Sequence, residues 1–223
     1  PENALSGLLK TAQLENSKIV GQVIAVSKDE SVDSLLEKLQ VNRRYPQDQE
    51  IRYVGGERQV ASFEEVLRDK AADSDQESMP EMPWREEGVY LITGGLGGLG
   101  LIFAEEILEK TPSARLILTG RSALKEEKAL RLQGLESRGL KVEYHAVDVS
   151  DKEAVEILVQ GIEKRWGGLH GIIHSAGIIK DKYLIKKNAI EFAEVMSPKV
   201  AGDIKLDRAS QTLGLDFFVV FSS

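Results

Sequence analysis

The fold is decided by residues 89–100, which read Val-Tyr-Leu-Ile-Thr-Gly-Gly-Leu-Gly-Gly-Leu-Gly. An apolar run leads into a glycine-rich turn, and the turn leads into an amphipathic segment. Gly94, Gly97 and Gly100 give the spacing G-x-x-G-x-x-G. Small residues at these positions let the main chain turn sharply and approach a ligand. The free N–H groups and the positive end of the following helix then face phosphate groups.

Glycine turns also end ordinary strands, so the strand before the turn and the helix after it carry the inference. Together they predict a dinucleotide-binding site. The residues assigned to its phosphate loop are Thr93, Gly94, Gly95, Leu96, Gly97, Gly98, Leu99 and Gly100.

Composition sets the outer limits on fold and function. The 223 residues suit one large domain or two small ones, and 42% of them are hydrophobic. The net charge of −7 argues against binding to nucleic acid, which needs a basic face. No apolar run reaches membrane-spanning length, and the N-terminus does not resemble a secretion signal. The absence of cysteine fits a cytoplasmic protein, and three histidines without ligand spacing predict no metal site.

Residues 71–87 divide the chain, because they are polar and acidic and contain two prolines. We read them as a linker, with Trp84 as its packing anchor. Domain boundaries follow at 1–83 and 84–223. Before the linker we expect a strand over 18–26, a helix over 31–39 and a hairpin of 51–54 with 57–61 that turns on Gly55 and Gly56. This first part contains no phosphate loop and no catalytic cluster, so its expected role is scaffolding.

After the linker, predicted strands and helices alternate. The strands are expected at 88–93, 115–119, 141–147, 169–174 and 213–221. The helices are expected at 98–110, 123–138, 150–166 and 190–208, the third opening on a capping box formed by Ser150 and Glu153. This alternation predicts an α/β fold with a doubly wound parallel sheet of the Rossmann type. Ligands in such sheets bind at the carboxyl ends of the strands.

The second strand is followed by Arg121 and Ser122. A site selective for NAD places an acidic residue there to bind the ribose 2′-hydroxyl, whereas an arginine suits the 2′-phosphate of NADP. Asp148 and Val149 follow the third strand. The carboxylate of Asp148 either accepts a hydrogen bond from the adenine amino group or caps the next helix.

The fourth strand ends at His174 and is followed by Ser175, Ala176 and Gly177. These small residues let the backbone pass close to the cofactor. We read His174 as a core histidine and give it no catalytic role.

Taken together, these motifs resemble the ketoreductase domain of modular polyketide synthases, within the short-chain dehydrogenase/reductase superfamily. The resemblance is dense from residue 84 onward and looser before it, where the first part is similar to the family's structural subdomain, a truncated Rossmann-like fold without cofactor. The general character of the sequence favours synthases that lack built-in acyltransferases. The matching motifs are 93–100, 118–122, 147–149, 174–177, Pro198-Lys199-Val200-x-Gly202 and Phe221-Ser222-Ser223.

The resemblance implies that hydride passes from NADPH to the β-keto group of a β-ketoacyl thioester. The substrate would be carried on the phosphopantetheine arm of an acyl carrier protein, among neighbouring synthase domains. By motif, the family's catalytic lysine is Lys199 and its catalytic serine is Ser223, in preference to Ser222. The family's catalytic tyrosine lies beyond residue 223, so we expect the chain by itself to be inactive as a reductase. No nucleic acid or membrane partner is implied.

A family motif that marks the hand of the product falls at Ile179-Lys180-Asp181. Asp181 is retained from it and is assigned to substrate orientation, which favours the D-configured hydroxyl. The alternative is a surface contact between Asp181 and Lys180 or Lys182. Two other functions remain open: a free-standing short-chain carbonyl reductase, and a nonreducing structural domain of a synthase.

Overall fold

The computed structural model describes residues 2–65, 83–139 and 141–221. These described residues form two compact units. The first contains residues 2–65 together with Lys182–Lys187, and the second contains the rest. No helix in these ranges is long and apolar enough to cross a membrane.

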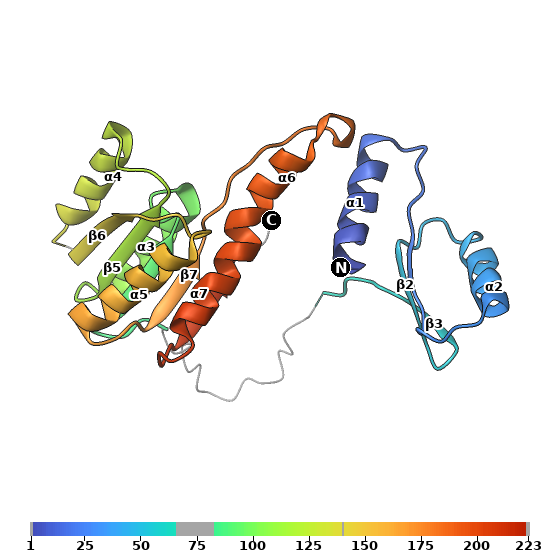
Figure 1. Ribbon diagram of the computed structural model, residues 1–223, viewed down its shortest axis with the longest axis horizontal. Helices are drawn as coiled ribbons and strands as arrows, with labels where there is room; N and C mark the ends of the chain where they lie inside the picture. Colours follow the sequence, from blue (N-terminus) through green and yellow to red (C-terminus); the bar gives the residue numbers. More distant parts are fainter. Residues whose placement is uncertain (1, 66–82, 140, 222–223) are drawn as a thin grey trace. The chain divides into compact units, whose positions relative to one another are not determined.

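The second unit is built on a sheet of five parallel strands in the order β6-β5-β4-β7-β8 (Figure 1). Every residue of the central strand β4 is buried, as expected of a parallel strand covered on both faces. The strands are β4 (Val89–Thr93), β5 (Arg115–Gly120), β6 (Lys141–Ala146), β7 (Gly171–His174) and β8 (Phe217–Val220).

Helices cover both faces of this sheet. One core cluster joins β4 and β5 to α3 (Gly98–Lys110) and α4 (Glu126–Glu136). The other joins the same strands to α5 (Lys152–Trp166) and α7 (Gly202–Ser210). The doubly wound α/β fold is therefore confirmed, and α3 has the predicted bounds.

Three details of the predicted helices were wrong. The helix expected over 123–138 is shorter, because α4 spans Glu126–Glu136. The N-cap of α5 is Asp151, whose side chain accepts a hydrogen bond from the backbone N–H of Ala154, and Ser150 instead bonds to Asp148. The single helix expected over 190–208 is divided into α6 (Ala189–Met196), a π-helical turn (Ser197–Ala201) and α7. Pro198 lies in that turn, and a proline has no N–H for the regular helical ladder.

Aromatic side chains pack together at the amino-terminal ends of β4 and β8. Trp84 lies edge-on to Tyr90 and to Phe217, and the last two rings are stacked. Arg85 binds both carboxylate oxygens of Asp216. Trp84 is thus a packing residue, as predicted, and it joins the chain before β4 to the start of β8.

The first unit has a smaller sheet in the order β1-β2-β3, with one parallel and one antiparallel pair. Gly55 and Gly56 have positive φ angles of 59° and 86°, which the predicted two-residue hairpin turn requires. The strand expected over 18–26 is shorter, and the helix over residues 2–15 was not predicted. The elements are α1 (Glu2–Glu15), β1 (Val23–Ala25), α2 (Val32–Asn42), β2 (Glu50–Val54), β3 (Glu57–Val60) and the 3₁₀ turn Leu184–Lys186.

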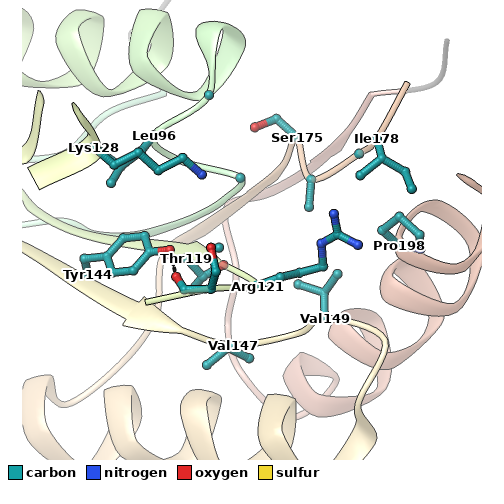
Figure 2. A pocket seen from close by; sticks show the side chains of 16 residues that line it. Leu96, Thr119, Arg121, Lys128, Tyr144, Val147, Val149, Ser175, Ile178 and Pro198 are labelled. Carbon is teal, nitrogen blue, oxygen red and sulfur yellow. Dashed lines mark hydrogen bonds between the residues drawn. The ribbon is translucent and has the colours of Figure 1, made fainter. Parts of the chain in front are cut away.

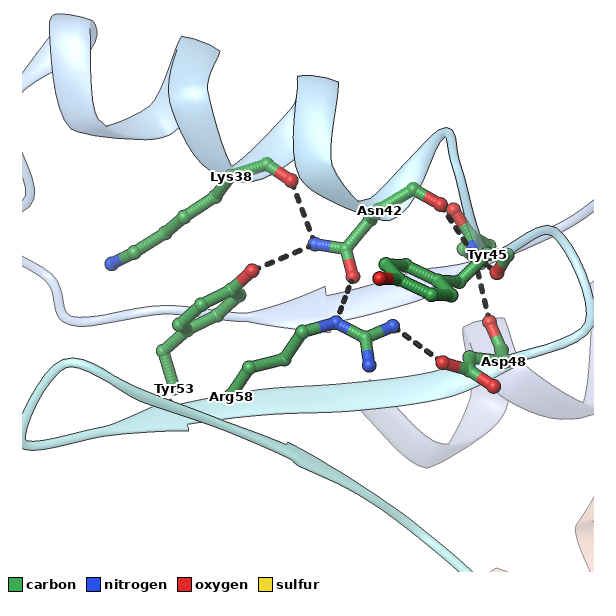
Figure 3. A network of polar contacts seen from close by, with 7 residues as sticks. Lys38, Asn42, Tyr45, Asp48, Tyr53 and Arg58 are labelled. Atoms are coloured by element: carbon green, nitrogen blue, oxygen red, sulfur yellow. Dashed lines mark hydrogen bonds and ion pairs between the residues drawn. The ribbon is translucent and has the colours of Figure 1, made fainter.

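A buried amide organises this unit (Figure 3). The Asn42 side chain donates to the Lys38 carbonyl at 2.8 Å and to the Tyr53 hydroxyl at 3.1 Å. It accepts from Arg58 Nε at 2.8 Å, and Arg58 also binds Asp48 at 2.6 Å. Every polar atom of the fully buried amide is therefore engaged, which joins α2 to both strands of the hairpin.

Candidate functional site

A cavity of about 230 Å³ opens at the carboxyl ends of β4, β5, β6 and β7 (Figure 2). Nine of the residues assigned from the sequence line it: Gly94, Leu96, Gly97, Arg121, Ser122, Val149, Ser175, Ala176 and Gly177. Four loops that are far apart in the sequence therefore meet at one site. This is the place where an open α/β sheet binds its ligand.

The glycine turn has the geometry of a phosphate cradle. Gly94 has a φ of +66°, and a Cβ added there would lie 2.9 Å from the Cα of Ala176. A Cβ on Gly100 would lie 2.7 Å from the Gly94 carbonyl oxygen, so the helix packs directly on the turn. Gly97 is the N-cap of α3 and supplies no side-chain cap. The first N–H groups of α3 are left without intrahelical partners, as a bound pyrophosphate needs.

Behind the turn, a buried hydrogen-bond chain fixes the ends of β4 and β7. Thr93 Oγ1 lies 2.5 Å from His174 Nδ1 and accepts from the Ala176 N–H at 3.3 Å. Ser175 Oγ donates to the Thr93 carbonyl at 2.7 Å. Thr93 is fully buried and does not line the cavity. Its hydrogen bonds support the loop after β7.

His174 is a core histidine, as we expected. It is 2% exposed, and its Nε2 lies 2.8 Å from the Pro198 carbonyl oxygen and 3.2 Å from Asp203 Oδ1. Burial raises the pKa of Asp203, and the neighbouring His174 opposes part of that rise. The ring thus ties the end of β7 to the π-helical turn, which contains Lys199.

Arg121 and Ser122, which follow β5, line one side of the cavity. Arg121 is exposed, and its guanidinium has no hydrogen-bond or ion-pair partner within the described chain. The Tyr144 hydroxyl donates to the Ser122 carbonyl at 2.7 Å, which holds the turn that carries Arg121. Burial raises the pKa of Tyr144. Thr119 lines the cavity, and its buried Oγ1 has no partner among the described residues.

Asp148 lies beside this cavity, in a second one of about 480 Å³ that shares Arg121, Ile178 and Pro198 with the first. Its Oδ1 accepts from the Ser150 hydroxyl at 2.7 Å and from the Ser150 N–H at 2.8 Å. These bonds lower the pKa of Asp148, with a smaller contribution from Arg121. The carboxylate therefore does not cap α5, and its Oδ2 has no hydrogen bond to the described residues.

The remaining assigned residues lie outside the cavity lining. Gly95, Gly98, Leu99 and Gly100 belong to the turn and the first turn of α3. Lys199 is half-buried, and a Cβ built on Gly177 would lie 3.5 Å from its Cε, which places its stem beside the loop after β7. Asp181 is exposed, and Lys180 pairs with Glu194 and not with it. Ser223 lies outside the described residues.

The sequence analysis assigned no site role to seven residues that line the cavity, although Thr119, Gly120, Val147 and Pro198 lie in its matching motifs. Tyr144 belongs to the predicted strand over 141–147, but nothing in the sequence marked its side chain as part of the cavity lining. Lys128 belongs to no motif that the sequence analysis singled out. The full set is Thr119, Gly120, Lys128, Tyr144, Val147, Ile178 and Pro198.

Comparison with known proteins shows the family to which this chain belongs. A family model described as the KR domain matches residues 88–223, which include the whole cavity. The chain belongs to the ketoreductase domain family of polyketide synthases. It is 47% identical over 221 residues to the polyketide synthases PksL and PksN of Bacillus subtilis, matching 99% of this chain but only 5% and 4% of theirs.

Solved structures agree with this membership. A ketoreductase domain from the bacillaene assembly line superposes with a TM-score of 0.85 at 46% identity, covering 98% of this chain and 50% of that one. An N-terminal ketoreductase from the macrolactin assembly line gives 0.74 at 33% identity, covering 99% and 43%. The chain thus spans about half the length of these ketoreductase chains.

Proposed function

We propose that this chain forms the cofactor-binding part of a β-ketoacyl reductase in a polyketide synthase. The substrate would be a β-ketoacyl thioester on the phosphopantetheine arm of an acyl carrier protein, and the product a β-hydroxyacyl thioester. The observation that carries the proposal is the cavity in which the glycine turn, Arg121 and Gly177 meet. The small share of each synthase that the chain covers favours a domain among other synthase domains over a free-standing reductase.

The residues present fit NADPH. The uncapped first turn of α3 offers N–H groups to a pyrophosphate, and Gly94 leaves room that any side chain would fill. Arg121 extends from the end of β5 into a cavity whose described lining contains no carboxylate, and the carboxylate of Asp148 interacts with it electrostatically from the neighbouring cavity. A guanidinium at this position suits a 2′-phosphate, to which it can donate two parallel hydrogen bonds.

In the proposed reaction, bound NADPH would supply the hydride to the substrate carbonyl carbon, and the tyrosine that the family resemblance implies would supply the proton to the carbonyl oxygen. Lys199, whose stem lies beside Gly177, would lower the pKa of that tyrosine and help to complete the proton relay. Ser223 would donate a hydrogen bond to that oxygen, in keeping with its motif. Asp181 would help to orient the acyl chain from the loop after β7. The fixed contact of His174 with the Pro198 carbonyl would keep the turn that carries Lys199 in place.

The experiment that tests this function is a fluorescence titration of the protein with NADPH and with NADH. We expect tighter binding of NADPH. Arg121→Ala should raise the Kd for NADPH about tenfold, since a hydrogen bond to a charged group contributes about 1.5 kcal/mol or more. The Kd for NADH should change less than about twofold. Arg138→Ala removes an exposed arginine of the same unit outside the cavity and is the matched control. Equal affinity of the unaltered protein for both cofactors would refute the assignment.

A further inference from the structure

The cavity has a charge opposite in sign to that of the chain. The protein carries a net charge of −7, yet the described residues that line the cavity include two cations and no carboxylate. One cation is Arg121, which the sequence analysis assigned. The other is Lys128, from the first half of α4. Figure 2 shows both side chains directed toward the same opening from different elements.

Lys128 has no carboxylate partner among the described residues. Its neighbour Glu127 forms an ion pair with Arg131 at 2.6 Å, so the nearest acid along the helix is already engaged. Lys128 makes no hydrogen bond or ion pair within the described chain. The ammonium group is therefore available to an anion in the cavity.

The helix that carries Lys128 is tied to the phosphate loop. Arg131 donates from Nη1 to the Leu96 carbonyl oxygen at 3.2 Å, while its Nη2 binds Glu127. Leu96 belongs to the glycine turn and lines the same cavity. This bond joins α4 to the turn, in addition to the core packing of Leu135, and so it helps to fix where the Lys128 side chain enters the cavity.

We infer that Lys128 is a second cation of the subsite for the 2′-phosphate, opposite Arg121, and that Arg131 is its positioning residue. The inference rests on the proposed function. A phosphomonoester carries a charge between −1 and −2 near neutral pH, so one guanidinium leaves part of it uncompensated. Arg121 supplies directional hydrogen bonds, and Lys128 supplies a point charge on a flexible stem. Selectivity for the phosphorylated ribose then depends on two elements, the turn after β5 and α4.

The test uses two small probes, adenosine 2′,5′-bisphosphate and 5′-AMP, which differ only in the 2′-phosphate. Calorimetric titration of the protein should show tighter binding of the bisphosphate. Lys128→Met keeps the stem and removes the charge, and it should raise the Kd for the bisphosphate about fivefold. The Kd for 5′-AMP should change less than about twofold. Lys128→Arg, which keeps the charge, should stay within about twofold of the unaltered protein for both probes.

Lys125→Met is the matched control, because it removes an equal charge three residues earlier at the start of α4, outside the cavity. It should leave both affinities unchanged. Added salt should weaken bisphosphate binding less steeply in Lys128→Met than in the unaltered protein, because fewer charge contacts remain to be screened. Arg131→Gln should reproduce part of the Lys128→Met effect on the bisphosphate and spare 5′-AMP.

The possible outcomes distinguish a failure of this inference from a failure of the proposed function on which it rests. If the unaltered protein prefers the bisphosphate and Lys128→Met keeps that preference in full, the inference is refuted while the proposed cofactor stands. If Lys128→Met weakens both probes equally, Lys128 serves another phosphate and the inference is again refuted. If the unaltered protein does not distinguish the probes, both the inference and the NADPH assignment are refuted.

Discussion

Replacing Gly97 with valine should abolish cofactor binding while the fold survives. Gly97 has a φ of −83°, which any residue can adopt, and an added Cβ would meet only the Gly94 carbonyl oxygen, at 3.0 Å. As an N-cap, valine is less favourable than glycine by about 1 kcal/mol. Replacing glycine with valine also stabilises the folded state by about 0.4–1 kcal/mol, because it reduces the conformational entropy of the unfolded chain. The net loss of stability should stay below about 1 kcal/mol, and the Tm should fall by no more than about 4 °C.

The effect on binding should be much larger. The valine methyl groups would occupy space at the first N–H groups of α3, where the pyrophosphate is expected to lie. Loss of two hydrogen bonds to a charged ligand costs about 3 kcal/mol or more, which corresponds to roughly a hundredfold in Kd. Calorimetry with NADPH measures the binding, and circular dichroism measures the Tm. Gly134→Val, at an exposed glycine of α4 with open space around it, is the control. If Gly97→Val bound NADPH within about threefold of the unaltered protein, the turn would not be the phosphate seat.

Three further predictions concern stability and turnover. Asn42→Ala should lower the free energy of unfolding by about 3 kcal/mol in urea titrations, because it leaves Arg58 Nε without its acceptor, whereas Gln47→Ala at an exposed site should have little effect. Burial lowers the pKa of His170 below its usual 6.5, with a further contribution from Arg85. The contribution of His170 to the free energy of unfolding should therefore be fully present above pH 6.5, and it should be lost as the pH falls from 6.5 toward the pKa of the folded state. Its Nδ1 accepts from the Val89 N–H at 2.8 Å, so His170→Gln should flatten the change in urea midpoint between about pH 7.5 and 5.5, and an unchanged slope would contradict this reading. In a synthase that contains this chain, Lys199→Glu should reduce turnover of a β-ketoacyl thioester by about a hundredfold or more. The same substitution should raise the Kd for NADPH less than about threefold. Parallel losses of turnover and of NADPH affinity would argue against a role of Lys199 in the reaction.

The sheet of the second unit was predictable because its signals are local. Parallel strands buried on both faces appear as continuous apolar runs, and β4 is the clearest of them. The spacing of Gly94, Gly97 and Gly100 fixed the start of α3 to the residue. Most of the cavity lining followed, because the carboxyl ends of parallel strands meet at one edge.

The rest depends on contacts that a sequence does not show. Ser150 and Asp151 are both good caps, and the choice of Asp151 is made by the bond between Ser150 and Asp148. The predicted helix over 190–208 is interrupted at Pro198, whose carbonyl is held by the buried His174. Lys128 lines the cavity from α4, and this helix is bonded to the glycine turn through Arg131 and the Leu96 carbonyl, 35 residues apart in sequence. The last two pairs of partners are 24 and 35 residues apart, too far for a periodic pattern to reveal them, and the choice between the neighbouring caps depends on side-chain geometry that a pattern does not show.

The most direct test of the account is a crystal structure of the protein with NADP⁺ bound. We expect the pyrophosphate against the turn of Gly94 and Gly97 and the 2′-phosphate between Arg121 and Lys128. The nicotinamide should lie toward Gly177 and Lys199. A dinucleotide seated anywhere else on the chain, or a protein that remains without it at saturating NADP⁺, would contradict the central claim that this cavity is the cofactor site.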